Sequence, residues 1–72
     1  MRIYRLTHRA ADATFTIWFV CAGSRNEAKK ILSKKAGPGV IEFPKYQGIP
    51  ERQKGIRPGG IEQYEPAYLR YA

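Results

Sequence analysis

The chain is poor in the residue types that build disulfides, metal sites and catalytic centres. Its 72 residues include one cysteine, Cys21, and one histidine, His8. A single cysteine cannot form an intrachain disulfide, which suits a reducing compartment such as the cytoplasm. A structural zinc site needs about four ligands at characteristic spacing, and the chain cannot supply them. We therefore expect no metal, no cofactor and no catalytic residue.

Long hydrophobic runs and acidic residues are also scarce. No stretch reaches the roughly 18 apolar residues of a membrane span, and the N-terminus alternates charged with apolar residues, unlike a signal peptide. The hydrophobic fraction of 43% is ordinary for a folded chain. We expect one small domain over residues 1–72, with no membrane association.

Positive charge dominates, and it is concentrated in the first half of the chain. There are 13 basic and 6 acidic residues, for a formal net charge of +7. Residues 1–37 hold eight basic and two acidic residues (net +6), whereas residues 38–72 hold five basic and four acidic residues (net +1). This imbalance is typical of an anion-binding surface. It is also compatible with a role in solubility alone, because small domains commonly carry a net charge of about 2–8.

Residue patterns predict two strands, a helix and one or two further strands. Residues 2–8 (RIYRLTH) and 14–22 (TFTIWFVCA) are rich in strand formers and are separated by a short connector, which favours an antiparallel hairpin. Residues 40–46 (VIEFPKY) predict an edge strand, because Pro44 cannot donate to a ladder. Residues 61–64 (IEQY) are compatible with a fourth strand, and the residues from Pro66 onward with a final helical turn.

The helix between the second and third strands has the clearest local signal. Ser24 and Glu27 form a capping box, in which the Ser24 hydroxyl accepts from the Glu27 amide and the Glu27 carboxylate reaches the Ser24 amide. An apolar stripe follows at helical spacing, made of Ala28, Ile31, Leu32 and Ala36. Gly-Pro-Gly at residues 37–39 ends the helix. The predicted fold is α+β: a small antiparallel sheet of three to four strands with one helix packed across one face, in ββαβ(β) order.

Two surfaces of this fold are candidates for binding. The outer side of the helix carries Lys29, Lys30 and Lys34, which are either phosphate ligands or plainly solvated. On the sheet, alternation along residues 14–22 sends the odd-numbered residues from Phe15 to Cys21 toward the helix, which leaves Trp18 on the open face beside Arg5 and Arg9. There Trp18 either stacks on bases or is covered by the C-terminal segment or by a second subunit.

Two further segments extend the set of candidate residues. Residues 47–60 form a long basic loop that carries Arg52, Lys54 and Arg57, and loops of this length are often functional. The C-terminal segment is rich in tyrosine and arginine, which are favoured at protein interfaces. The predicted partner-interface residues are Trp18, Tyr64, Tyr68, Arg70 and Tyr71.

The sequence thus predicts a small, basic, non-catalytic nucleic-acid-binding module with an accessory or regulatory role. The alternative is a protein-interaction module or inhibitor that binds an acidic surface of a larger protein, and both would suit a phage or mobile-element genome. A metal-independent nuclease that uses His8 or a glutamate as base is a lesser alternative. A homodimer is compatible with either binding role. The predicted nucleic-acid-binding residues are Arg5, Arg9, Trp18, Arg25, Lys29, Lys30, Lys34, Arg52, Lys54 and Arg57.

Overall fold

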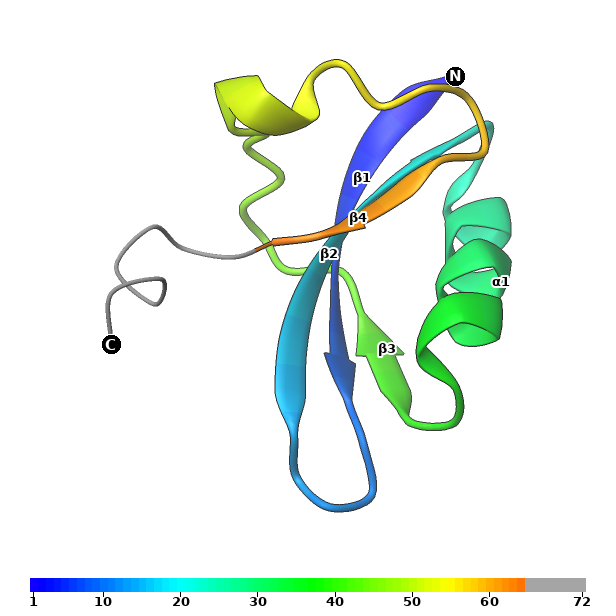
Figure 1. Cartoon of the computed structure of the whole chain (residues 1–72), viewed down its shortest axis with the longest axis vertical. Coiled ribbons are helices and arrows are strands. Elements are labelled where there is room, and N and C mark those ends of the chain that lie inside the picture. Colours follow the sequence, from blue (N-terminus) through cyan, green and yellow to red (C-terminus); the bar gives the residue numbers. More distant parts are fainter. Residues whose placement is uncertain (65–72) are drawn as a thin grey trace.

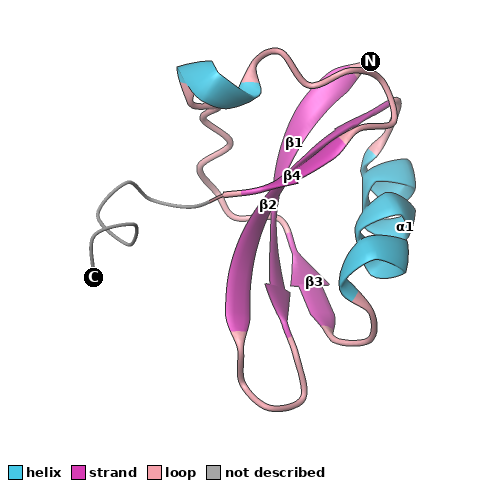
Figure 2. Ribbon diagram, in the orientation of Figure 1, coloured by secondary structure: helices cyan, strands magenta, loops and turns pink. Residues whose placement is uncertain are grey.

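A computed structural model describes residues 1–64 and confirms the predicted α+β architecture. The elements follow the order β1 (Arg2–Arg9), β2 (Phe15–Ala22), α1 (Arg25–Ala36), β3 (Val40–Glu42), a 3-10 helix η1 (Glu51–Gln53) and β4 (Ile61–Gln63). The four strands form one antiparallel sheet in the order β3-β1-β2-β4. Helix α1 covers one face of this sheet, and the chain after β3 passes to the other side (Figures 1 and 2).

The β1–β2 hairpin forms the centre of the sheet. Its pairing is continuous from Arg2 opposite Ala22 to Arg9 opposite Phe15. At its tip, the Ala10 N–H donates to the Thr14 carbonyl over 2.9 Å. Ala13 adopts a positive φ of 70°, and the Thr14 N–H donates to the Asp12 carboxylate. Asp side chains that accept from a backbone N–H two residues later favour turns of this kind. The connector therefore fixes the hairpin register locally.

Helix α1 begins and ends where the sequence predicts, with one difference in the capping. The Glu27 N–H donates to the Ser24 hydroxyl over 3.2 Å, as expected. The Glu27 carboxylate, however, accepts from the Gly23 N–H over 3.0 Å rather than from Ser24. Gly23 allows this close approach because a Cβ there would lie 3.0 Å from the carboxylate oxygen. At the other end, Gly37 has φ of 83° and its N–H donates to the Ser33 carbonyl.

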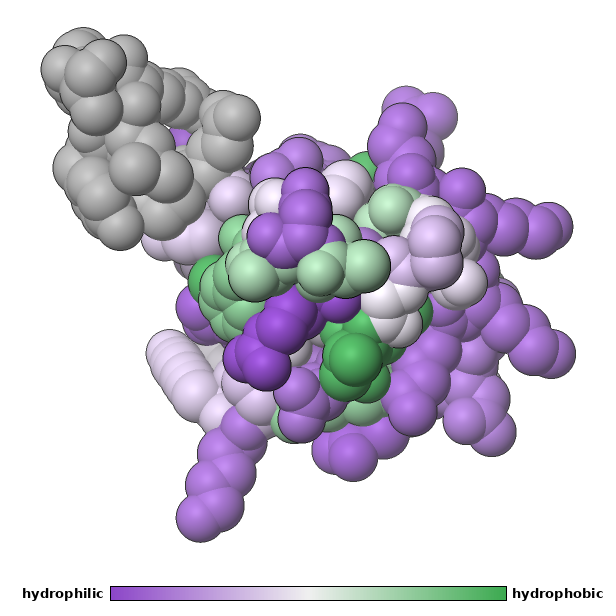
Figure 3. Space-filling model, turned by 90° about the horizontal axis from the view of Figure 1, so that it is seen from below, coloured by the Kyte–Doolittle hydropathy of each residue, from purple (hydrophilic) through white to green (hydrophobic). Residues whose placement is uncertain are grey.

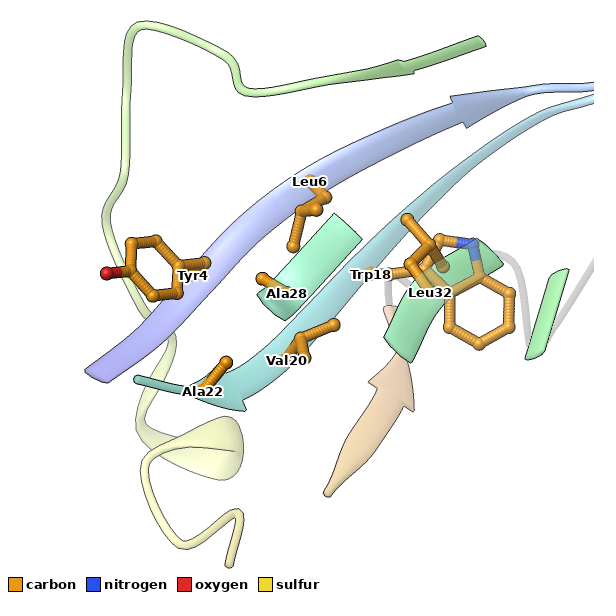
Figure 4. Packing of buried hydrophobic residues seen from close by; sticks show 7 residues of the cluster. All are labelled: Tyr4, Leu6, Trp18, Val20, Ala22, Ala28 and Leu32. Carbon is orange, nitrogen blue, oxygen red and sulfur yellow. The ribbon is translucent and has the colours of Figure 1, made fainter. Parts of the chain in front are cut away.

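The prediction that the odd-numbered residues of β2 face the helix is wrong. The core between sheet and helix contains Trp18, Val20 and Ala22 from β2, together with Tyr4, Leu6, Ala28 and Leu32 (Figure 4). The register explains this, because Leu6 lies opposite Trp18 and Tyr4 opposite Val20, and directly opposed residues share a face of the sheet. Trp18 is therefore covered by α1, at 8% exposure, and its indole N–H donates to the Thr16 hydroxyl.

His8 lies on the same face as this core, at the end of β1. Its ring is buried, and Nε2 is 3.2 Å from the Gly37 carbonyl oxygen. A Cβ at Gly39 would come within 2.6 Å of the same ring nitrogen, so glycine is required there for packing. The histidine thus holds the chain that leaves α1 against the sheet, and this position argues for a packing role.

The remaining strands are shorter than the sequence suggests. β3 ends at Glu42, and Phe43 instead packs edge-on against the Tyr4 ring at 5.9 Å. This stops the ladder two residues before Pro44, while the predicted edge position of β3 is confirmed. The fourth strand exists as β4. The turn predicted from Pro66 and the interface residues Tyr68, Arg70 and Tyr71 lie outside the described residues.

Two absences hold for residues 1–64. No helix in this range is long and apolar enough to cross a bilayer. No group of three or more metal-ligating side chains comes together within it.

The two faces of β2 give a direct stability test. Because Trp18 is buried in the core and Phe15 is 53% exposed, we expect Trp18→Leu to lower the free energy of unfolding by about 2 kcal/mol or more, and Phe15→Leu by less than about 0.5 kcal/mol. Urea unfolding followed by far-ultraviolet circular dichroism measures both variants. A larger loss from Phe15→Leu than from Trp18→Leu would contradict the observed facing of the strand.

Candidate nucleic-acid interface

The structure divides the predicted cationic residues into three separate groups. One group lies on α1, one on the sheet face that α1 does not cover, and one in the loop around η1, which lies across the sheet from α1 in Figure 1. In this order the predicted residues are Arg25, Lys29, Lys30 and Lys34; Arg5 and Arg9; and Arg52, Lys54 and Arg57.

The helix group is the densest of the three. The 12 residues of α1 include five cations, which are Arg25, Lys29, Lys30, Lys34 and Lys35, and one carboxylate, Glu27. All five cationic residues are exposed, and the Glu27 carboxylate is held at the helix start by the Gly23 N–H. Within residues 1–64 no carboxylate lies within 4.0 Å of any of these cations, because the one ion pair in this range joins Lys54 and Glu51. We call the exposed surface of α1 that bears these five residues the helix face; at 3.6 residues per turn, Lys30 and Lys34 lie on one side of it, and Arg25 and Lys29 lie on another.

Aromatic rings, rather than carboxylates, hold two of the helix cations. The Arg25 guanidinium carbon is 5.1 Å from the centre of the Phe43 ring, and the Lys29 ammonium nitrogen is 5.8 Å from it. Arg2 lies in the same way over Tyr4, at 5.7 Å. Cation–π contacts of this kind orient a cation without neutralising its charge. Sequence reasoning missed Phe43 and Arg2, and nothing in the local pattern could have paired Phe43 with a helix.

The face of the sheet opposite α1 combines cations with apolar side chains in register. β1 contributes Arg5, Thr7 and Arg9, and their partners on β2 are Phe19, Ile17 and Phe15. The placement of Arg5 and Arg9 on this face agrees with the sequence prediction. Trp18 does not lie on this face, because it is buried on the helix side of the sheet. It is therefore not positioned to stack on bases there, contrary to the sequence prediction.

The chain after β3 covers the half of this face that contains Arg5 and Phe19. The Arg5 guanidinium carbon lies 5.6 Å from the centre of the Phe19 ring, 5.5 Å from Tyr46 and 5.9 Å from Tyr64. Arg5 Nη1 also donates to the Gly48 carbonyl over 3.4 Å. Phe19 is fully buried beneath this cover and packs edge-on against Tyr64 at 5.7 Å. Tyr64, predicted as an interface residue, is thus engaged with the sheet.

Gln47 fastens this covering segment to the edge of β1. Its side-chain oxygen accepts from the Arg5 N–H over 2.9 Å, and its side-chain nitrogen donates to the Arg5 carbonyl over 2.9 Å. The same nitrogen is 2.9 Å from the Pro44 carbonyl, to which it also donates. The Gln47 side-chain amide therefore makes the two backbone hydrogen bonds with Arg5 that a neighbouring strand would make. β3 does not reach this point, because it pairs only with residues 7–9 of β1.

The loop cations form the weakest candidate group. The ammonium of Lys54 is 2.9 Å from the Glu51 carboxylate, but the side chains are 58% and 88% exposed, so the pair contributes little to stability. The loop is more structured than the sequence suggests, since η1 forms within it and Gln53 is buried. Arg52 and Arg57 are exposed.

A carboxylate lies at the hairpin tip beyond Arg9. The side-chain and backbone hydrogen bonds from Thr14 hold the pKa of Asp12 below its ordinary value of 3.8. Asp12 therefore stays ionised at neutral pH, and an approaching phosphate is repelled at the tip itself. The cationic part of the sheet face ends before the turn.

Comparison with known proteins gave no match: no family model matches the chain, and neither a curated protein nor a solved structure is significantly similar to it. The basis for a functional proposal is therefore the charge and geometry of the chain itself.

The role of Gln47 gives a testable stability difference. We expect Gln47→Ala to lower the free energy of unfolding by about 1–3 kcal/mol, because the Arg5 N–H and carbonyl and the Pro44 carbonyl lose their shared partner. Gln63→Ala, at an exposed position on β4, is the matched control and should change it by less than about 0.5 kcal/mol. Equal effects of the two substitutions in urea unfolding would contradict the anchoring role.

Proposed function

We propose that the protein is a non-catalytic nucleic-acid-binding module with an accessory or regulatory role, and that it contacts phosphates through the helix face. The observation that carries this proposal is the five cations on α1 with no carboxylate partner within residues 1–64. Each cation that reaches a phosphate releases condensed counterions, which is the main source of sequence-independent affinity for nucleic acid.

The geometry of α1 supports repeated phosphate contacts along one line. Lys30 and Lys34 are four residues apart, which places them as neighbours on one side of a helix, with about 5–6 Å between their Cβ atoms. The whole helix is about 18 Å long at 1.5 Å per residue. Lys30 and Lys34 can therefore contact neighbouring phosphates of one backbone at the same time.

Helix stabilisation and solvation account for only part of this cationic pattern. Lys34 and Lys35 lie in the last turn, where cations complement the partial negative charge of the helix end. This effect is confined to the last turn, so it does not account for Arg25, Lys29 and Lys30. Solvation is the competing explanation for these three residues, and it predicts no preference for the helix face over the loop cations. An acidic protein surface is the competing partner, and salt dependence separates it from nucleic acid.

The proposal leaves out the loop cations, because they lie across the sheet from α1 in Figure 1 and cannot join the same line of contacts. The packing role of His8 supports the non-catalytic part of the proposal.

Salt dependence of duplex binding tests the proposal. Fluorescence anisotropy of a labelled DNA duplex should show an affinity that falls linearly with salt concentration on logarithmic axes. Lys30→Gln should reduce the magnitude of this slope by about 1, and the Lys30→Gln/Lys34→Gln double variant by about 2. Arg52→Gln removes one charge from an exposed side chain across the sheet, and it should leave the slope almost unchanged.

Two outcomes would contradict the proposal. Equal effects of Lys30→Gln and Arg52→Gln would mean that total charge, rather than the helix face, attracts the duplex. A wild-type protein that ignores both DNA and RNA at low salt but binds an acidic protein with defined stoichiometry would favour the interaction module.

A further inference from the structure

We infer that the half of the sheet face opposite α1 that residues 1–64 leave uncovered is a second site, which binds unpaired bases of a single-stranded nucleic acid. We call it the sheet patch and define it by Thr7, Arg9, Phe15, Ile17 and Val40. This inference rests on the proposed function, since it names the kind of nucleic acid that is bound and a surface distinct from the helix face.

The sheet patch places a cation directly beside an exposed aromatic ring. Arg9 and Phe15 are opposite each other in the β1–β2 ladder, which puts their Cβ atoms about 4.5–5.5 Å apart on one face. Phe15 is 53% exposed, and Val40, which is opposite Arg9 on β3, is 57% exposed. Seen from the hairpin end, apolar side chains lie near the centre of the surface, with a strongly hydrophilic side chain between them and further hydrophilic ones around them (Figure 3).

This pairing matches the two parts of a nucleotide. A base can stack on the Phe15 ring while the Arg9 guanidinium holds the adjoining phosphate, which is how sequence-tolerant single-strand sites are built. A shallow hollow next to Arg9, lined also by Ala10, Pro38, Gly39 and Val40, leaves room for a sugar or a second base. A duplex cannot use the site in this way, because its bases are stacked on one another and their faces are closed.

Tyr46 extends the aromatic surface along the same face. It is 63% exposed and its ring lies 5.5 Å from the Arg5 guanidinium carbon. Arg5 and Arg9 are four residues apart on β1, which corresponds to about 13 Å along the strand. The two exposed rings, Tyr46 and Phe15, are thus each paired with an arginine of β1. Such a spacing suits a short strand of a few nucleotides rather than a single base.

Besides Asp12 at the hairpin tip, Glu42 is a carboxylate that borders the sheet patch. It lies opposite Thr7, and its backbone carbonyl accepts from the Thr7 hydroxyl over 3.3 Å. Within residues 1–64 it forms no ion pair with Arg9, so the arginine charge is free for a phosphate. Glu42 repels phosphates at the β3 edge and Asp12 repels them at the hairpin tip, so the phosphate position at Arg9 lies between these two carboxylates. Glu42 also distinguishes a nucleic acid from a second copy of the chain as the occupant of the patch. It repels a phosphate, but in a dimer it would attract Arg9 of the other copy.

The test compares a labelled single-stranded ten-nucleotide uridine RNA with a DNA duplex of ten base pairs, both by fluorescence anisotropy. Phe15→Ala should weaken binding of the single strand by about 5- to 150-fold, the range for loss of one stacked base, and leave duplex binding unchanged. Lys30→Gln is the matched control, and it should weaken duplex binding more than single-strand binding. Glu42→Gln should strengthen single-strand binding, because a like charge is removed beside the phosphate. Thermal unfolding of each variant verifies that it is folded.

The outcomes separate this inference from the proposed function. If the wild type binds neither probe, both are overturned. If it binds both probes and Phe15→Ala changes neither affinity, or both equally, the sheet-patch site is overturned and the helix-face proposal stands. If the protein is a dimer in solution that Phe15→Ala and Glu42→Gln both dissociate, a second copy occupies the patch and the inference is wrong.

Discussion

The pairing of Leu6 with Trp18 across the β1–β2 ladder is the constraint on which the rest of the structure depends. A strand has a side-chain period of two, so a shift of one residue would reverse the facing of every side chain on β2. With the observed register, Trp18, Val20 and Ala22 meet the helix, and Phe15, Ile17 and Phe19 meet the other side. The composition of the core and the sheet patch both follow from this choice.

The two faces of the sheet are closed by different kinds of contact. On the helix side, aliphatic and aromatic side chains form the core, and the fully buried Ala22 and Ala28 let the start of α1 approach the sheet closely. On the other side, the cover is a loop held by the Gln47 amide and by three rings around the Arg5 guanidinium. The loop stops short of Phe15, and this leaves an exposed ring beside Arg9.

Local patterns were enough to predict the hairpin, the helix and the residues at which the helix begins and ends, but they could not decide which face of β2 meets the helix. Both alternating sets are mainly apolar: Phe15, Ile17, Phe19 and Cys21 on one side, and Trp18, Val20 and Ala22, together with the polar Thr16, on the other. Phe19 is as fully buried as Val20, because the strand has cover on both faces. The apolar residues Ile49 and Ile56 within the polar loop were the available signal that the loop packs against something.

The candidate site was predictable where local sequence patterns determine it, and not where contacts between distant residues do. Charge and helical spacing placed Lys29, Lys30 and Lys34 on the outer side of α1 without knowledge of the fold. The contact of Phe43 with Arg25 and the Gln47 bridge join residues far apart in the chain, so no window of sequence reveals them. The sequence therefore predicts Trp18 as the aromatic residue beside Arg9, whereas the observed register makes it Phe15.

The fluorescence of Trp18, the one tryptophan in the chain, is the most direct measure of this register. The observed pairing predicts an emission maximum typical of a buried indole, weak quenching by acrylamide, and no change in that quenching when a single-stranded oligonucleotide is added to saturation. An emission typical of solvent-exposed indole, strong quenching, and protection by the oligonucleotide would show that Trp18 lies on the open face, and would contradict the register and the sheet patch that depends on it.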